Sequence, residues 1–188
     1  MWLYEKKLEY PVNIQRRDLR MAKNLMAQYG GPDGELAASI RYLNQRYTMP
    51  DERGKALLTD IGTEELAHVE IISTMVYQLM QGATIKELED AGLGGHYTQH
   101  GMALFPTDAN GVPFTTAYVE ASADYMADLE SNMSAEQRAR AVYENLMNET
   151  NDPDVLAPLS FLRQREVVHH QRFKELRDYY LTKYPKNT

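Results

Sequence analysis

Two long helical stripes in this sequence are each interrupted by a Glu and a His three residues apart, Glu65 with His68 and Glu166 with His169. Apolar residues flank both pairs at spacings of three and four, which is the period of one face of an α-helix. Side chains three apart share a helix face, so each pair is predicted to point into a helix-packing core. Charged groups in a core are strongly destabilising unless other groups compensate them. The chain must therefore fold so that several segments bring compensating groups to these four side chains.

The predicted helices come in two pairs that are separated by a long connection. Apolar periodicity predicts helices over residues 18–29, 34–47, 53–81, 115–148 and 154–184, with a shorter one over 85–91. The stretch Ser134-Ala-Glu-Gln137 matches a capping box, which is the signal of a helix start inside the fourth long segment. Residues 83–113 are rich in Gly and Pro and are predicted to form the crossover. The order indicates an all-α, ferritin-like four-helix bundle with one long crossover and an additional short N-terminal helix.

A symmetry of spacing brings two further carboxylates to the level of the Glu–His pairs. Glu35 lies thirty residues before Glu65, and Glu136 lies thirty residues before Glu166. The midpoint of each interval falls in a predicted turn that contains a proline. In an antiparallel hairpin, the two Glu of each pair therefore lie at the same height. Four helices then bring four Glu and two His to one level, which is the di-iron or di-manganese carboxylate arrangement. Carboxylate and imidazole ligands in a chain without Cys suit manganese and iron. The alternative is buried, hydrogen-bonded Glu–His pairs that hold no metal.

Four other residues have both a functional and a structural interpretation. Tyr42 follows the first Glu by seven residues, and it either hydrogen-bonds a ligand or packs in the core. Arg140 follows the third Glu by one turn, and it either neutralises the carboxylates or forms a surface ion pair. His96 and His100 lie in the crossover, where solvated loop histidines are the favoured interpretation.

Charge and hydropathy exclude several classes of protein. A formal net charge of −7 argues against a nucleic-acid binder, which usually carries a basic surface. The longest uncharged run, residues 91–107, contains four Gly and a Pro, so no membrane-spanning segment is expected. Charged residues near the N-terminus and the lack of an apolar core region there predict cytoplasmic synthesis without a signal peptide.

Long motifs surround the candidate residues. They read YGGPDGELAA at 29–38, RYLNQRY at 41–47, LTDIGTEELAHVE at 58–70, RQREVVH at 163–169, MWLYEKKLEYP at 1–11 and GVPFT at 111–115. These motifs resemble the manganese catalase family, and most closely its spore-coat branch, the CotJC type, over nearly the whole chain. The resemblance implies a single ferritin-like dinuclear-metal domain over residues 1–188, with residues 1–17 as an N-terminal strap.

The resemblance also implies an activity and a ligand set. It implies a dimanganese catalase that disproportionates hydrogen peroxide to water and dioxygen, with two manganese ions per chain and metal ligands Glu35, Glu65, His68, Glu136 and His169. Glu65 would bridge the ions, and Glu166 would stay uncoordinated beside the substrate as a catalytic residue, whereas spacing alone makes Glu166 a sixth ligand. There are two departures from the family pattern. Ala135 stands where some active members carry an Arg, and this sequence ends nineteen residues after His169, earlier than larger members do.

The implied partners follow from the same resemblance. It implies a homo-oligomer, with the family's hexamer as one form, located in the spore coat among other coat proteins, and without nucleic-acid or membrane partners. Exposed apolar residues of the crossover, together with the strap, are expected to make the subunit contacts; they are Leu93, Tyr97, Met102, Leu104 and Phe105. The alternatives are a di-iron oxidase or ferroxidase, which would hold iron, and a structural spore-coat protein with a weakly active metal site.

Overall fold

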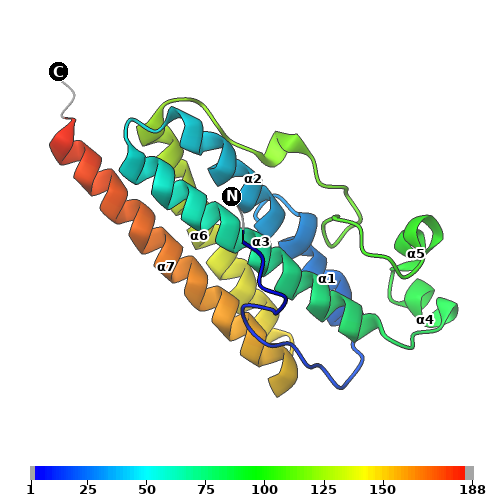
Figure 1. Cartoon of the computed structure of the whole chain (residues 1–188). Helices are drawn as coiled ribbons and strands as arrows, with labels where there is room; N and C mark the ends of the chain where they lie inside the picture. The colour runs from blue at the N-terminus through cyan, green and yellow to red at the C-terminus, as the bar shows by residue number, and fades with distance from the viewer. Residues whose placement is uncertain (1–2, 185–188) are drawn as a thin grey trace.

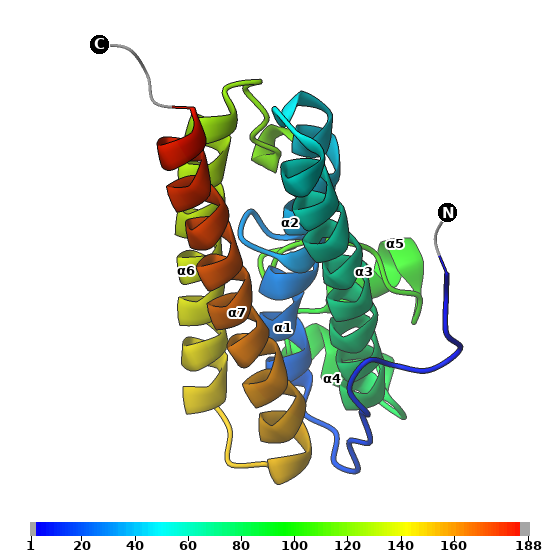
Figure 2. The ribbon, with the colours of Figure 1, turned by 60° about the vertical axis from the view of Figure 1, so that its left-hand side comes forward.

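Two antiparallel helical hairpins lie side by side along a common axis (Figures 1 and 2). The structure is a computed structural model that describes residues 3–184. Its helices are α1 (Leu19–Gly30), α2 (Glu35–Gln45), α3 (Glu52–Met80), α4 (Ile85–Asp90), α5 (Gly94–His100), α6 (Tyr125–Asn148) and α7 (Pro153–Lys183), with 3-10 turns η1 (Arg46–Thr48) and η2 (Thr116–Tyr118). Residues 3–184 contain one isolated β-bridge and no strand. The predicted all-α bundle with a long crossover is confirmed.

The first long column of the bundle is a broken helix, α1 followed by α2, that packs against α3. The break occurs at the predicted Gly-Gly-Pro sequence, where the crossover passes very close to the backbone. The Gly30 N–H donates to the carbonyl of Thr107 at 3.2 Å. A Cβ on Gly30 would lie 2.4 Å from the carbonyl carbon of Pro106, so only glycine allows this approach. The turn that follows places Glu35 at the first position of α2.

Aspartate side chains start the long helices. Asp51 caps α3 by accepting from the Gly54 N–H, and Asp152 caps α7 by accepting from the Asp154 N–H. Asp124 is the N-cap of α6, which begins at residue 125. The predicted helix start near residue 115 was therefore ten residues early. The expected break at Ser134 was also wrong: α6 is continuous there, and the Ser134 hydroxyl accepts from the side chain of Arg138 one turn along the same helix.

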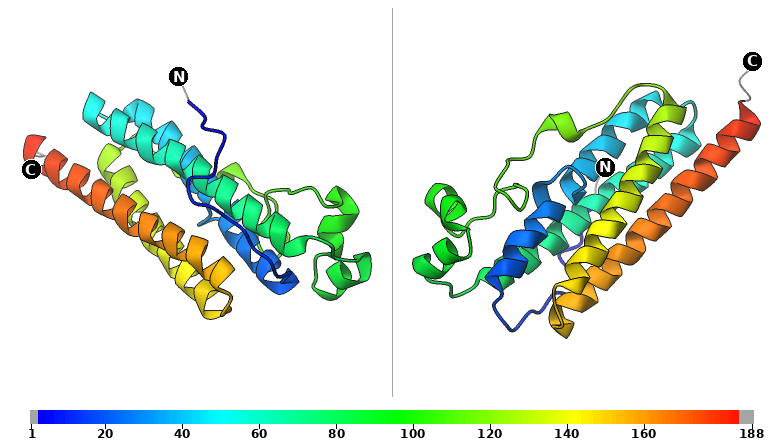
Figure 3. Two further views of the ribbon diagram at one scale, coloured as in Figure 1. Left: turned by 60° about the horizontal axis from the view of Figure 1, so that its bottom comes forward. Right: turned by 180° about the vertical axis from the view of Figure 1, so that it is seen from behind.

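The crossover packs more closely on the bundle than its sequence indicated (Figures 1 and 3). Its two short helices, of which α5 was not predicted, cover one end of α1 and α3. Leu93 is 3% exposed, and Tyr97, Met102 and Leu104 pack against the apolar core. The prediction that these side chains are exposed was wrong for all of them except Phe105, which is 38% exposed. From residue 101 the chain returns along α1 and α2 to reach α6.

The N-terminal segment lies across α3 and α7 before α1 begins (Figure 2). The ring of Tyr10 stacks on Phe161 of α7 with 4.9 Å between ring centroids. Gln78 of α3 accepts from the Ile14 N–H at 2.7 Å and donates to the Val12 carbonyl at 3.2 Å. Met1 and Trp2, which belong to the sequence motif at residues 1–11, lie outside the described residues. None of the described helices is long and apolar enough to cross a bilayer.

Candidate metal centre

The apolar core is divided into two clusters, and the candidate ligands lie between them. One cluster includes Ile71 of α3 and Leu162 of α7, while the other includes Ile61 of α3 and Phe173 of α7. All six predicted site residues fall in the gap and are at most 2% exposed: Glu35, Glu65, His68, Glu136, Glu166 and His169. The structure therefore brings together every residue that the sequence placed at this level.

Glu65 is shared by two groups of potential ligands. Ligand atoms of Glu35, Glu65, His68 and Glu166 lie within 4.8 Å of one another, and so do those of Glu65 with Glu136 and His169. One oxygen of Glu65 lies 2.7 Å from Nδ1 of His68, and the other lies 2.9 Å from Nδ1 of His169. The two imidazole rings are nearly parallel, with 5.6 Å between their centroids. This arrangement has the symmetry of two metal positions bridged by one carboxylate.

Several buried atoms at the site have no hydrogen-bond partner within residues 3–184. They are Glu65 Oε1, Glu136 Oε2, Glu166 Oε1, His68 Nε2, and both Nδ1 and Nε2 of His169. Buried polar atoms are almost always satisfied, so each of these needs an explanation. Glu65 Oε1 and His169 Nδ1 are near each other yet lack hydrogen-bond geometry. A donor set of carboxylate oxygens and imidazole nitrogens fits manganese or iron, and a metal pair would satisfy these atoms.

Two tyrosines hold the outer carboxylates in a reciprocal arrangement. Tyr42, seven residues after Glu35 on α2, donates to Glu136 on α6. Tyr143, seven residues after Glu136, donates to Glu35. The core-packing interpretation of Tyr42 is confirmed, since its ring centroid lies 4.9 Å from that of Phe173, and its hydrogen bond goes to a candidate ligand. Tyr143 was not singled out from the sequence, although its equivalent spacing from the Glu on its own helix was a usable signal.

A further carboxylate, Glu64, lies on the outer side of both histidines and was missed. Its Oε2 lies 3.2 Å from Nε2 of His169, and its Oε1 lies 3.8 Å from Nε2 of His68. Arg165 donates to the same carboxylate. From the N-terminal segment, Glu9 approaches Nε2 of His68 at 3.7 Å. Outer carboxylates of this kind orient metal-binding histidines. Here Nε2 of both rings faces Glu64 without hydrogen-bond geometry, and Nδ1 of both rings is turned toward Glu65.

The environment divides the buried carboxyl groups into two kinds. Burial raises the pKa of Glu35 to about 7, and burial together with the neighbouring carboxylates raises the pKa of Glu166 well above its usual range. Burial also acts to raise the pKa of Glu65, but the charges of His169 and His68 outweigh it and hold that pKa low. Glu65 is therefore held as an anion, whereas Glu166 is readily protonated. Paired groups of this kind, with pKa values driven apart, are typical of proton-transfer sites.

The remaining candidates lie away from the centre. Arg140 forms a 2.7 Å ion pair with Glu144, which is the structural interpretation of that residue. His96 lies 2.9 Å from the carbonyl of Ala103 through Nε2, and the ring of His100 stacks on Phe105 at 4.2 Å. Both histidines belong to α5 and not to an extended loop.

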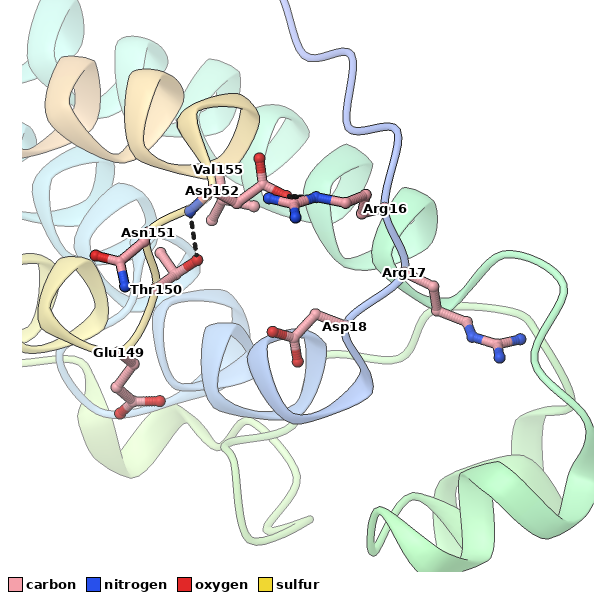
Figure 4. A pocket seen from close by; sticks show the side chains of 8 residues that line it. All are labelled: Arg16, Arg17, Asp18, Glu149, Thr150, Asn151, Asp152 and Val155. Carbon is pink, nitrogen blue, oxygen red and sulfur yellow. Dashed lines mark hydrogen bonds and ion pairs between the residues drawn. The ribbon is translucent and has the colours of Figure 1, made fainter.

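Two pockets differ in their relation to the centre. A narrow cavity of about 10 Å³, roughly the room that one water molecule needs, is lined by Pro32, Asp33, Gly34, Glu35, Ala38, Arg41, Tyr42, Ala135, Glu136, Ala139 and Glu166. Its lining includes both the turn before α2 and the buried carboxyl groups. A larger surface pocket of 330 Å³ lies between the segment before α1 and the α6–α7 turn (Figure 4). None of the six candidate residues lines that larger pocket.

Comparisons with known proteins agree with this geometry. A family model described as manganese containing catalase matches residues 1–178. Protein CotJC of Bacillus subtilis strain 168 is 55% identical over 175 residues, covering 93% of this chain and 92% of that protein. A manganese catalase of Lactiplantibacillus plantarum is 33% identical over 196 residues, covering 98% of this chain and 74% of that protein. The crystal structure of KatB, a manganese catalase from Anabaena PCC7120, superposes with a TM-score of 0.86 at 28% identity, over 100% of this chain and 84% of KatB.

Proposed function

Since the chain belongs to the manganese catalase family and to the CotJC branch within it, we propose that it disproportionates hydrogen peroxide to water and dioxygen at two manganese ions. The observation that carries the proposal is the bridging position of Glu65, which offers one oxygen to each histidine. We assign metal binding to Glu35, Glu65, His68, Glu136 and His169. The whole chain would form one dinuclear-metal domain.

The metal pair, when bound, supplies the two electrons that this reaction exchanges. The protein supplies position, charge balance and a proton carrier. Glu65 contributes a fixed negative charge between the two histidines, and the hydroxyls of Tyr42 and Tyr143 orient the outer carboxylates. Burial of the whole set excludes bulk water, which strengthens each of these electrostatic interactions.

We assign the proton-carrier role to Glu166. Its Oε1 is buried without a partner in the described chain, and its side chain lines the narrow cavity through which a small substrate would arrive. The raised pKa favours a carboxyl that takes up a proton easily. The positive charge of the bound metal pair would lower this pKa, so that Glu166 would accept a proton from arriving peroxide at this oxygen and return it when the O–O bond breaks.

The Glu166→Gln variant tests this assignment, because it keeps the volume of the side chain and removes the titrating group. We expect it to retain two manganese ions per chain and to lose most of its dioxygen evolution. Glu130→Gln, on the exposed side of α6, is the matched control and should keep both. Loss of metal from Glu166→Gln would make Glu166 a sixth ligand, and retention of full turnover would refute the proton-transfer role.

A di-iron oxidase or ferroxidase is the second candidate function. It is favoured by the position of Glu166, whose ligand atom lies within the same 4.8 Å group as those of Glu35, Glu65 and His68. A sixth protein ligand is what spacing alone predicted. Metal analysis of protein isolated from its native source separates the two candidates, since manganese supports the catalase and iron supports the oxidase.

The proposed location is the spore coat, as the similarity to CotJC suggests. A purely structural coat protein with a weakly active metal site would bind metal but evolve little dioxygen, so the same assay tests it. We also propose a homo-oligomer in which the N-terminal segment takes part, because Leu3 is 88% exposed and Tyr4 is 69% exposed. Monomeric sedimentation at micromolar concentration would contradict the oligomer.

A further inference from the structure

Two of the helices that line the narrow cavity, α2 and α6, contribute side chains of different character. Ala135 and Ala139 of α6 contribute only methyl groups, whereas α2 contributes the long side chain of Arg41. The inner end of the cavity is formed by carboxyl groups, including those of Glu136 and Glu166. A molecule that enters therefore has a guanidinium on one side and carboxyl groups ahead of it.

Arg41 is buried, and its bonding is incomplete. Its side chain belongs to a residue only 3% exposed, and Nη2 donates to the backbone carbonyl of Tyr118 at 2.9 Å. Its Nε is buried and finds no hydrogen-bond partner within residues 3–184. The neighbouring Arg138 is different, because it is partly exposed and forms a 2.7 Å ion pair with Asp33 at the outer end of the cavity. A buried guanidinium N–H without an acceptor is costly, so it requires a function or a ligand.

We propose that Arg41 binds hydrogen peroxide, or a small anion in its place, in this cavity through its Nε–H. Peroxide has acceptor lone pairs for the Arg41 donor and its own O–H groups for the carboxyl of Glu166. The cavity has room for about one water-sized molecule, so its ligand must be close to that size and must take the place of any water there. Arg41 is thus the substrate-binding group on the way to the metal pair, and this assignment rests on the proposed function.

If Arg41 only anchored the crossover and bound no ligand, its substitution would have a different effect. Arg41 also anchors the crossover over α2 through Tyr118, and Gln45 anchors the same segment by donating to the carbonyl of Glu120 at 2.7 Å. Gln45 does not line the cavity. If anchoring were the only role of Arg41, Arg41→Met and Gln45→Met would affect ligand binding equally.

The test uses the manganese-loaded protein and azide, a small anion whose binding to the site is followed by the visible absorption of the metal. We expect Arg41→Met to weaken azide binding about tenfold or more, since hydrogen bonds from charged donors are strong. It should also raise the KM for peroxide more than it lowers kcat. Gln45→Met should lower the melting temperature and leave azide affinity unchanged. The double variant Arg41→Met with Ala135→Arg returns a guanidinium from the opposite wall and should recover part of the lost affinity.

Two results would overturn the proposal. One is an azide affinity of Arg41→Met within twofold of the wild-type value, and the other is an equal weakening in Gln45→Met. If Arg41→Met fails to fold, Arg41→Lys decides the matter, because it keeps the charge but lacks the Nε donor and should still bind azide more weakly. Azide binding requires no turnover, so this comparison decides the role of Arg41 whether or not the wild-type protein evolves dioxygen.

Discussion

Removing the Glu64 carboxylate should weaken metal binding although this residue is not a proposed ligand. Its Oε2 lies 3.2 Å from His169 Nε2, which is near hydrogen-bond length, while the 3.8 Å contact with His68 is weaker. Loss of such an outer carboxylate costs about 10- to 100-fold in metal affinity, or about 1.4–2.7 kcal/mol. In Glu64→Ala the guanidinium of Arg165 would also lose its carboxylate partner. We therefore expect about 100-fold weaker manganese binding in Glu64→Ala and about tenfold in Glu64→Gln, whose amide oxygen still accepts a hydrogen bond.

Manganese affinity is measured by competition with a chelator, and occupancy by elemental analysis. Glu52→Gln is the matched control, because it removes a carboxylate from the same helix where the side chain is 88% exposed. Glu9→Gln should cost at most about fivefold, because Glu9 is partly exposed and lies 3.7 Å from His68 Nε2. An affinity of Glu64→Ala within twofold of wild type would show that the histidines are oriented by packing alone, and the reasoning would be wrong.

Four other predictions concern the metal site and the bundle. His68→Ala should lose most of its metal, and full occupancy in the double variant with His169→Ala would contradict the site. Manganese affinity should rise with pH up to about 10, because the metal displaces a proton from His169, whose pKa is raised to about 10, and it should rise more steeply below about 7, where Glu35, whose pKa is raised to about 7, also releases a proton; a flat plot of log Kd against pH would refute this. Metal removal should lower the melting temperature in calorimetry, since the buried carboxylates lose their counter-charge, and an unchanged value would argue against a buried cluster. Gly62→Val should lower the free energy of unfolding by about 1–3 kcal/mol, because a Cβ there lies 2.9 Å from Leu43 Cγ, and a urea titration with an unchanged midpoint would contradict this.

The central part of this fold could be read from the sequence because the relevant signals are local or depend on simple symmetry. Helical periodicity located α3 and α7, and equal spacing across a hairpin was enough to bring Glu35 and Glu136 to the height of the Glu–His pairs. Such reasoning needs only the rise of a helix and the position of a turn.

The missed features depend on contacts between segments that no local pattern records. Glu64 is adjacent to Glu65 and lies off the apolar stripe, so its place behind the histidines follows only from how α3 packs on α7. The cavity role of Arg41 needs both α6 and the returning crossover. The apolar crossover residues, such as Leu93, looked exposed because a Gly-rich sequence gave no sign that α4 and α5 fold back over the bundle.

The division of the proposed ligands between two hairpins has a consequence for how the protein matures in the cell. The α2–α3 hairpin carries Glu35, Glu65 and His68, while His169 is synthesised 104 residues (169 − 65) after Glu65. Each hairpin can form early from contacts between neighbouring segments, but N-terminal parts emerge from the ribosome first. A nascent chain therefore holds only half of the centre until α7 has left the ribosome. Insertion of the proposed metal pair would then be a late step, because it requires ligands from both hairpins.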